Sequence, residues 1–213
     1  MPALVPTITS EGQPLDPDVR VHSIEVRKEL GRIPEARLVL YDGSVTDREF
    51  KVSNTAFFEP GKQIRVTLRE GDDPPKQLFL GLVVRHTVQA EANRMELRVE
   101  LRDAAIALTR QRKGVIHRDQ RDGDIVRKLA RAARLRLGRI DATRVRHREI
   151  VQFQATDWDF LLSRADVNGQ VVIVDDGVLS MRSMTARAAG AAVRLQFGLD
   201  IIDELELDRK SVV

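Results

Sequence analysis

Carboxylates are the side chains whose number and spacing could support catalysis, and they are concentrated in "TDWDFLLSRADVNGQVVIVDDGVLSM", residues 156–181. Two carboxylates can act as general acid and base, and several together can bind a metal ion. Asp159 and Asp166 are seven positions apart, so on a helix they share a face but lie roughly 10 Å apart along the axis. That exceeds the ~5 to 5.5 Å of a retaining glycosidase pair and slightly exceeds the inverting range. This helix alone therefore supplies no working pair.

The other acids of this stretch are Asp157 near its start and the pair Asp175 and Asp176 in "VDDG". An EF-hand calcium loop needs acids at alternate positions and a glycine at the sixth, and this spacing is absent. We interpret the pair, with Gly177, as the turn of a β-hairpin, and the earlier acids as residues of a helix terminus. No catalytic residue and no metal site is predicted.

Other reactive groups are scarce. The 213-residue chain has no cysteine, which excludes disulfides, thiolate metal sites and a cysteine nucleophile. No serine lies in a Gly-x-Ser-x-Gly elbow, no glycine-rich phosphate loop has the required spacing, and the four histidines fall in different predicted elements. We expect no enzyme, no cofactor and no small-molecule substrate; an enzyme using the acid cluster is the weakest interpretation, because no nucleophile, base and orienting group can be named together.

A helix after Thr156 must position the first acids. Thr156 is a good N-cap, Asp159 completes a capping-box arrangement, and Asp157 lies where the helix dipole favours negative charge. Gly169 supplies a left-handed residue at the C-terminal end, and "QVVIVDDGVLSM" then predicts the hairpin. The apolar face of this helix consists of Trp158, Leu161, Leu162 and Ala165.

A second helix is predicted in "DGDIVRKLARAARLRLG", over residues 124–137. Asp122 or Asp124 starts it and Gly138 stops it. Its polar face carries three arginines, namely Arg127, Arg131 and Arg134.

These arginines belong to a basic segment, residues 118–148, with eleven Lys and Arg against four Asp, although the whole chain has a net charge of only +3. Clustered arginines can bind phosphates, so a basic nucleic-acid-binding module built on helix 124–137 is the alternative function. The segment has no aromatic residue to stack on bases and no helix-turn-helix glycine turn. We therefore favour a solvated face or a contact surface for another subunit or partner.

Strands are predicted throughout residues 19–103. Apolar and polar residues alternate in "KQIRVTLRE" and "RMELRVELRD", as in a sheet with one buried face. Between them, "QLFLGLVVRHTVQAE" contains Gly81, where a bulge or a sharp bend is expected. Five or six closely spaced strands indicate a small antiparallel β-barrel or sandwich.

The expected fold is mainly β, of the α+β class. Residues 1–105 form an antiparallel β-barrel domain, residues 106–185 a small α/β segment with two helices and a hairpin, and residues 186–213 a final β segment that lacks partners. The N-terminus has no basic region followed by an apolar one, and no stretch approaches the ~18 apolar residues that span a bilayer. We expect no signal peptide, no membrane anchor, and a cytoplasmic protein unless a dedicated machine exports it.

Several phrases, in order along the chain, resemble the N-terminal hub region of the Vgr family, the spike proteins of type VI secretion and related phage-like contractile injection systems. They are "GRIPEARLVLYDG", "FKVSNTAFFEPGKQIRVTL", "LFLGLVVRHTVQ", "LRDAAIALTRQRKGVIH" and "REIVQFQATDWDFLLSRADVNGQVVIVDDGVL". The chain departs from the family where "ADVNG" replaces an acid-rich "EEEG" and where Phe153 replaces the usual tyrosine.

The resemblance implies a structural hub that adapts the inner tube to the puncturing needle. It implies that residues 186–213 start a second β-barrel, and the chain is then either part of a longer spike or a minimal hub-like member. The implied partners are two further copies in a homotrimer, inner tube and baseplate proteins, and an effector or spike-tip protein. Assembly is expected in the cytoplasm, followed by export within the apparatus.

Overall fold

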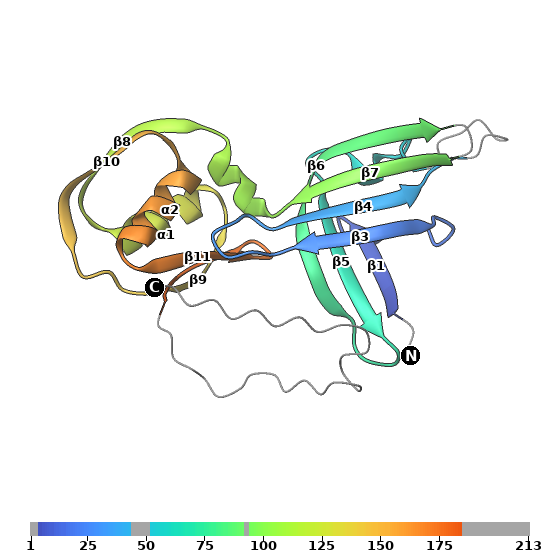
Figure 1. Ribbon diagram of the computed structural model, residues 1–213, viewed down its shortest axis with the longest axis horizontal. Helices are drawn as coiled ribbons and strands as arrows, with labels where there is room; N and C mark the ends of the chain where they lie inside the picture. The colour runs from blue at the N-terminus through green and yellow to red at the C-terminus, as the bar shows by residue number, and fades with distance from the viewer. Residues whose placement is uncertain (1–3, 44–51, 92–93, 185–213) are drawn as a thin grey trace, which may run out of the picture.

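The computed structural model describes residues 4–43, 52–91 and 94–184. This part of the chain folds into two lobes that lie side by side along the long axis of the molecule (Figure 1). Each lobe buries a hydrophobic core of its own. The predicted final β segment, residues 186–213, lies outside the described residues.

The first lobe is a seven-stranded antiparallel sheet with the strand order β2-β1-β5-β6-β7-β4-β3. The strands are β1 (Leu4–Ser10), β2 (Gln13–Pro14), β3 (Val21–Arg27), β4 (Glu35–Tyr41), β5 (Gln63–Glu70), β6 (Lys76–Glu91) and β7 (Arg94–Arg102), with a short 3-10 helix, η1 (Ala56–Phe58). The prediction of a mainly β fold is confirmed. In the described part of the chain none of the sheets closes into a barrel, because β2 and β3 remain the two edges of this one.

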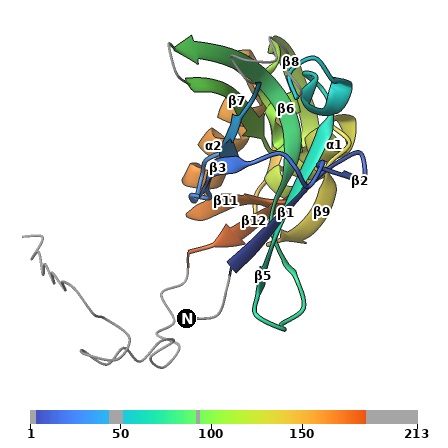
Figure 2. The ribbon, with the colours of Figure 1, turned by 90° about the vertical axis from the view of Figure 1, so that its right-hand side faces the viewer.

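The sheet bends around its core. Figures 1 and 2 show β1 and β5 running steeply to β3, β4 and β7, with the long strand β6 between the two sets. Every second residue along the strands faces inward, so Ile64 and Val66 of β5 are fully buried, as are Leu97, Val99 and Leu101 of β7. The alternation predicted from the sequence therefore marks the buried face correctly.

Gly81 lies in the bent strand β6, opposite Ile64 of β5. The register of β6 shifts on both sides of it, near Phe79 and between Val83 and Arg85. A Cβ atom at this position would lie 2.5 Å from the carbonyl oxygen of Arg102 and 2.6 Å from the ring of Phe79. Glycine therefore permits the close approach of β6 and β7 at the bend.

Strand β1 was not predicted from the sequence. It pairs with β5 along its whole length and buries Ile8 in the core. Pro6 obscures it, because proline weakens a strand signal. The carbonyl of Ile8 accepts from the N–H of Leu15, on the side of β1 away from β5, and the nitrogen of Pro6 lies on the same side because it is two residues earlier. There β2 pairs only with Thr9 and Ser10, so no partner strand needs the missing N–H.

The second lobe packs two helices between two small sheets (Figure 1). The helices are α1 (Asp122–Ala132) and α2 (Asp157–Val167). One sheet is a ribbon of β8 (Arg112–Arg121) and β10 (Arg146–Thr156), and the other has β11 (Gln170–Asp175) antiparallel to β12 (Val178–Ser183), which is parallel to β9 (Arg136–Ile140). A 3-10 helix, η2 (Ala104–Thr109), leads into this lobe from β7.

The end of α1 differs from the prediction of a helix over residues 124–137. The helix ends at Ala132, and Gly138 lies in β9 rather than stopping the helix. Arg134 adopts a φ of +58° while the N–H of Leu135 donates to the carbonyl of Ala130, a Schellman ending. The predicted end of the helix was wrong because an arginine, and not the expected glycine, occupies this left-handed position.

The two lobes meet at the turn of the β11–β12 hairpin. Asp176 and Gly177 have φ angles of 49° and 74°, as in a two-residue type I′ turn. The N–H of Gly177 donates to Asp103, which follows β7, at 2.7 Å, and Asp176 accepts from the N–H of Leu80 in β6 at 2.9 Å. The N–H of Gly31 also donates to the carbonyl of Val172 in β11. The hairpin thus ties the second lobe to the sheet of the first.

Candidate functional site

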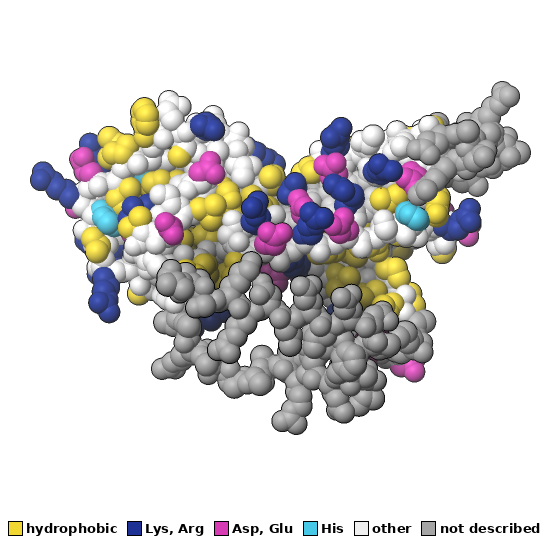
Figure 3. Space-filling view, in the orientation of Figure 1, with side chains coloured by type: hydrophobic (Ala, Val, Ile, Leu, Met, Phe, Trp, Pro, Cys, Tyr) yellow, Lys and Arg dark blue, Asp and Glu magenta, His cyan; other side chains and the backbone are white. Residues whose placement is uncertain are grey.

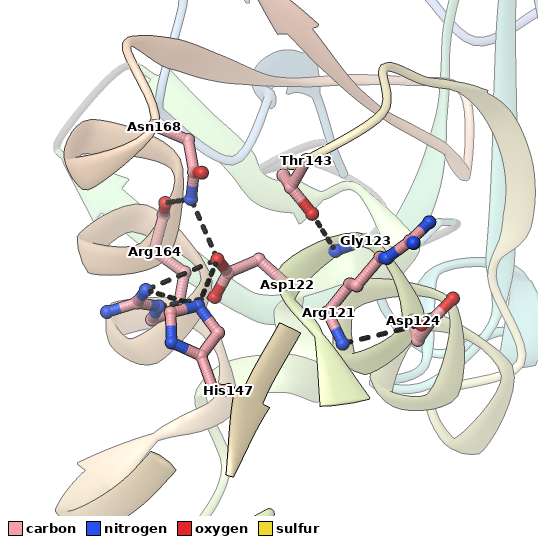
Figure 4. A network of polar contacts seen from close by, with 8 residues as sticks. All are labelled: Arg121, Asp122, Gly123, Asp124, Thr143, His147, Arg164 and Asn168. Atoms are coloured by element: carbon pink, nitrogen blue, oxygen red, sulfur yellow. Dashed lines mark hydrogen bonds and ion pairs between the residues drawn. The ribbon is translucent and has the colours of Figure 1, made fainter. Parts of the chain in front are cut away.

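Asp122 is a buried carboxylate at the centre of a network of polar contacts (Figure 4). Among the described residues, this network is the best candidate for a functional site. Asp122 is the first residue of α1 and is 1% exposed. Arg164 of α2 donates to both of its oxygens, at 2.5 and 3.2 Å. Asn168 donates at 3.0 Å, and His147 of β10 lies 3.1 Å away through Nε2. One side chain therefore joins α1, α2 and β10.

Two opposing effects act on the ionisation of Asp122. Burial raises the pKa of the carboxyl, because the charged form loses its hydration. The hydrogen bonds from Arg164, Asn168 and His147 outweigh burial, and the resulting pKa of Asp122 is below its usual range. The carboxylate is thus held ionised by the partners that it joins.

The network offers no nucleophile for catalysis. The hydroxyl within the network is that of Thr143, whose Oγ1 accepts a hydrogen bond from the N–H of Gly123 at the start of α1. At the same helix terminus, the backbone N–H of Arg121 donates to the carboxylate of Asp124 at 3.4 Å. Across residues 4–43, 52–91 and 94–184, no cluster of three or more His, Asp or Glu could hold a metal ion. The geometry is that of a structural clamp.

Two of the three acids of α2, Asp157 and Asp159, occupy its first turn. Thr156 Oγ1 accepts from the N–H of Asp159 at 3.0 Å and donates to the carboxylate of the same residue at 2.7 Å. Asp157 is 6% exposed and accepts from Lys113 of β8 at 2.6 Å and from Gln152 of β10 at 3.0 Å. These contacts fix the start of α2 against the ribbon.

The apolar residues of α2 serve packing. Trp158, Leu161 and Ala165 are buried in the second core with Phe160, whereas Leu162 is only partly buried. Gly169 follows the helix with a φ of +61°. The remaining acid of the helix, Asp166, is exposed.

The three arginines of the predicted contact surface differ in their surroundings. Arg127 lies 3.2 Å from Asp124 in an ion pair one turn earlier on α1. Arg131 is exposed in the last turn of the helix, and Arg134 is exposed in the turn that follows it. The structure therefore leaves Arg131 and Arg134 open to solvent at the C-terminal end of α1.

The principal partners of Asp122 were not predicted from the sequence. Arg164 and Asn168 are 42 and 46 positions away, and His147 is 25 positions away. No local pattern marks them, because the contacts exist only once α1, α2 and β10 have packed together. The one sequence signal is the acid at the first helical position.

On a second charged surface, the positive side chains form ion pairs with negative side chains of the same surface. The outward face of β3, β4 and β7 carries Arg and Glu side chains intermingled near the junction of the lobes (Figure 3). Arg102 pairs with Glu35, and Arg98 lies 3.1 Å from Glu96.

Within the described part of the chain, no helix is long and apolar enough to cross a membrane.

Solved structures share this fold at low sequence identity. A 43 kDa tail protein of prophage MuSo2 from Shewanella oneidensis is 14% identical with a TM-score of 0.64, and the match covers 84% of this chain and 53% of the tail protein. An E. coli component of the type VI secretion system, described as similar to T4 bacteriophage tail proteins, is 15% identical with a TM-score of 0.58, and the match covers 82% of this chain and 48% of that component. A chain of a PdpA–VgrG complex is 11% identical with a TM-score of 0.55, and the match covers 84% of this chain and 34% of the other.

The fold is therefore shared with a phage tail protein and with a component of the type VI secretion system. The chain spans about half the length of the first two of these structures. No curated protein matches the sequence. The family model described as the Alg8 N-terminal domain matches residues 2–212, and the chain therefore belongs to that family.

Proposed function

We propose that the chain is a structural hub component of a phage-tail-like contractile injection apparatus. The observation that carries this proposal is the fold, which spans both lobes and is shared with a prophage tail protein and a type VI secretion component. The chemistry of the described residues supports it, because the buried acids are used to hold elements together.

The finer role follows from the resemblance to Vgr proteins. The hub adapts the inner tube to the puncturing needle, as a homotrimer that contacts tube and baseplate proteins and carries an effector or spike-tip protein. In this proposal residues 1–105 are the first hub barrel, residues 106–185 the α/β segment, and residues 186–213 the start of a second barrel. The hub assembles in the cytoplasm and leaves the cell within the apparatus. It is not an enzyme.

The exposed arginines give this hub a contact surface. Arg131 and Arg134, with Arg127 beside them, are proposed to face an acidic region of another subunit or of a partner protein. The basic segment, residues 118–148, has no aromatic residue to stack on bases, which favours this role over nucleic-acid binding.

Immunogold labelling of contractile particles tests the proposed function. Particles pelleted from the cells that encode this chain should bind antibodies against it, with gold at the end of the particle that carries the baseplate. Deletion of the gene should abolish complete particles, and the wild-type gene should restore them. Normal particles without the chain would contradict the proposal.

A further inference from the structure

The outer face of the β8–β10 ribbon exposes apolar side chains that the second core does not use. Ile116 and Val151 stand opposite each other in the register and are 51% and 56% exposed. Phe153, two residues further along β10, is 77% exposed. We call these three residues the ribbon face. Figure 3 shows hydrophobic side chains at the surface of this lobe, on the side where β8 and β10 run in Figure 1.

Side chains alternate between the two sides of each strand, and this alternation places the ribbon face on the side away from the core. His117 and Gln152, the neighbours of Ile116 and Val151 along the chain, are 3% and 0% exposed and point toward the helices. Leaving Phe153 in water forgoes the favourable free energy that burial of a large apolar side chain contributes. In the described residues β8 and β10 pair only with each other, so each also has an edge open to a further strand.

Arginines border the ribbon face along β8. Arg112 is exposed and donates to the backbone carbonyl of Gln154 at 3.4 Å. Arg118 is exposed on the same side of the strand and lies 3.1 Å from Glu149. A partner that fits this surface must offer apolar side chains flanked by negative charge, because burial of the apolar centre brings the arginines close to it.

The chain itself contains such a segment. Residues 199–208, "LDIIDELELD", which lie outside the described residues, have five Asp and Glu, no Lys or Arg, and apolar side chains between the acids. We propose that the ribbon face of one copy binds residues 199–208 of a second copy of this chain. The proposal rests on the proposed self-assembly of the hub.

The contact is heterologous, because one copy contributes the ribbon face and the other contributes the acidic segment. A repeated contact of this kind closes into a ring when the rotation between copies allows it, as in a trimer. Every copy then uses both surfaces. This gives the hub a subunit contact made entirely of this chain's own residues.

Pairwise cysteine cross-linking tests the contact on a clean background, because the chain has no native cysteine. A copy with Phe153→Cys is mixed with a differently tagged copy with Leu205→Cys and treated with a short bis-maleimide. We expect a covalent heterodimer in at least tenfold higher yield than from a control pair. The control replaces Phe153→Cys with Asp72→Cys, which is exposed in the β5–β6 turn of the other lobe. Circular dichroism confirms that each variant is folded.

Charge reversal provides a second readout. The pair Arg112→Glu and Arg118→Glu on the first copy should lower the cross-linking yield at least fivefold, because like charges then face each other. Glu204→Lys with Glu206→Lys on the second copy should restore it. An unchanged yield after the first pair of substitutions would overturn the proposed charge match.

Three results separate this inference from the proposed function. Unmodified protein that self-associates by light scattering, without the Phe153→Cys to Leu205→Cys cross-link, overturns the inference alone. A cross-link that forms only within one chain carrying both cysteines, at monomer mass, also overturns it, because the segment then folds back on its own copy. Protein that stays monomeric overturns both the inference and the proposed self-assembly.

Discussion

At the scale of single residues, several of the described acids act through partners that are distant in sequence. Asp122 is the clearest case, because it shares one helical turn with Asp124 but is buried, whereas Asp124 is exposed. Removing one partner of a buried ion pair leaves the other charge uncompensated, which costs far more than losing an exposed pair. The two residues therefore form a matched pair for mutagenesis.

We expect Asp122→Asn to lower the free energy of unfolding by about 2–4 kcal/mol, since Arg164 loses its counter-charge. Asp124→Asn should lower it by less than about 1 kcal/mol. Because the pKa of Asp122 is below its usual range, its contribution is present above about pH 4 and is lost as the pH falls through the folded-state pKa. Urea titrations at pH 7 and pH 3 should show the difference between variant and wild type shrinking at the lower pH.

His117 predicts a second dependence on pH. It is 3% exposed, it stacks on Phe160, and burial lowers its pKa. The unfolded chain then binds the proton more readily than the folded one, so stability is lost as the pH falls from about 7.5 to below 6.5. His117→Phe should flatten this part of the stability curve, measured by urea unfolding every half pH unit. An unaltered slope would show that His117 is not the group responsible.

At the scale of elements, the end of α1 is held by a residue with an unfavourable backbone conformation. Arg134 adopts the left-handed region at φ +58°, where glycine has no steric cost. We expect Arg134→Gly to raise the free energy of unfolding by about 0.5–1 kcal/mol, after allowing for the greater freedom of glycine in the unfolded chain. Arg131→Gly, inside the helix, should lower it by about 1 kcal/mol. Thermal unfolding followed by circular dichroism distinguishes the two outcomes.

Glycines inside strands set how closely the elements approach. A Cβ atom at Gly138 of β9 would collide with Ser180 Oγ and lie 3.0 Å from Val178, both in β12, whereas Gly114 of β8 has nothing within 4 Å. Gly138→Ala should therefore destabilise by about 1–3 kcal/mol through overpacking, and Gly114→Ala should stay within about 0.5 kcal/mol of wild type. Chemical denaturation of both variants checks this. Equal effects would mean that β9 can shift away from β12.

At the scale of the whole molecule, the proposed hub predicts a defined assembly. The full-length protein should have a solution mass three times that of one chain by multi-angle light scattering. If charged surfaces contribute to the contact, the assembly should weaken as salt rises from 0.05 to about 0.5 M, because screening shortens the reach of the charges. A monomer or a dimer at every concentration would contradict the trimer.

The sequence by itself determined much of this protein. Alternation in β5 and β7 identified the buried face of the sheet, and Thr156 with Asp159 identified the start of α2, because strand and helix periods and N-caps are local properties. The ordered phrases that resemble Vgr proteins pointed to the same fold that the prophage tail and type VI secretion structures share.

Only the tertiary structure decided how the acids are used and where α1 ends. The contact of Asp122 with Arg164 spans 42 positions, and β9 pairs with β12 across a similar distance, so no local pattern encodes either. Arg134 takes a left-handed conformation because the chain must turn so that Leu135 enters the second core. Packing requires this turn, and the residue type at position 134 does not. Long-range packing thus made Asp122 and the turn of the β11–β12 hairpin the joints of a two-lobed scaffold.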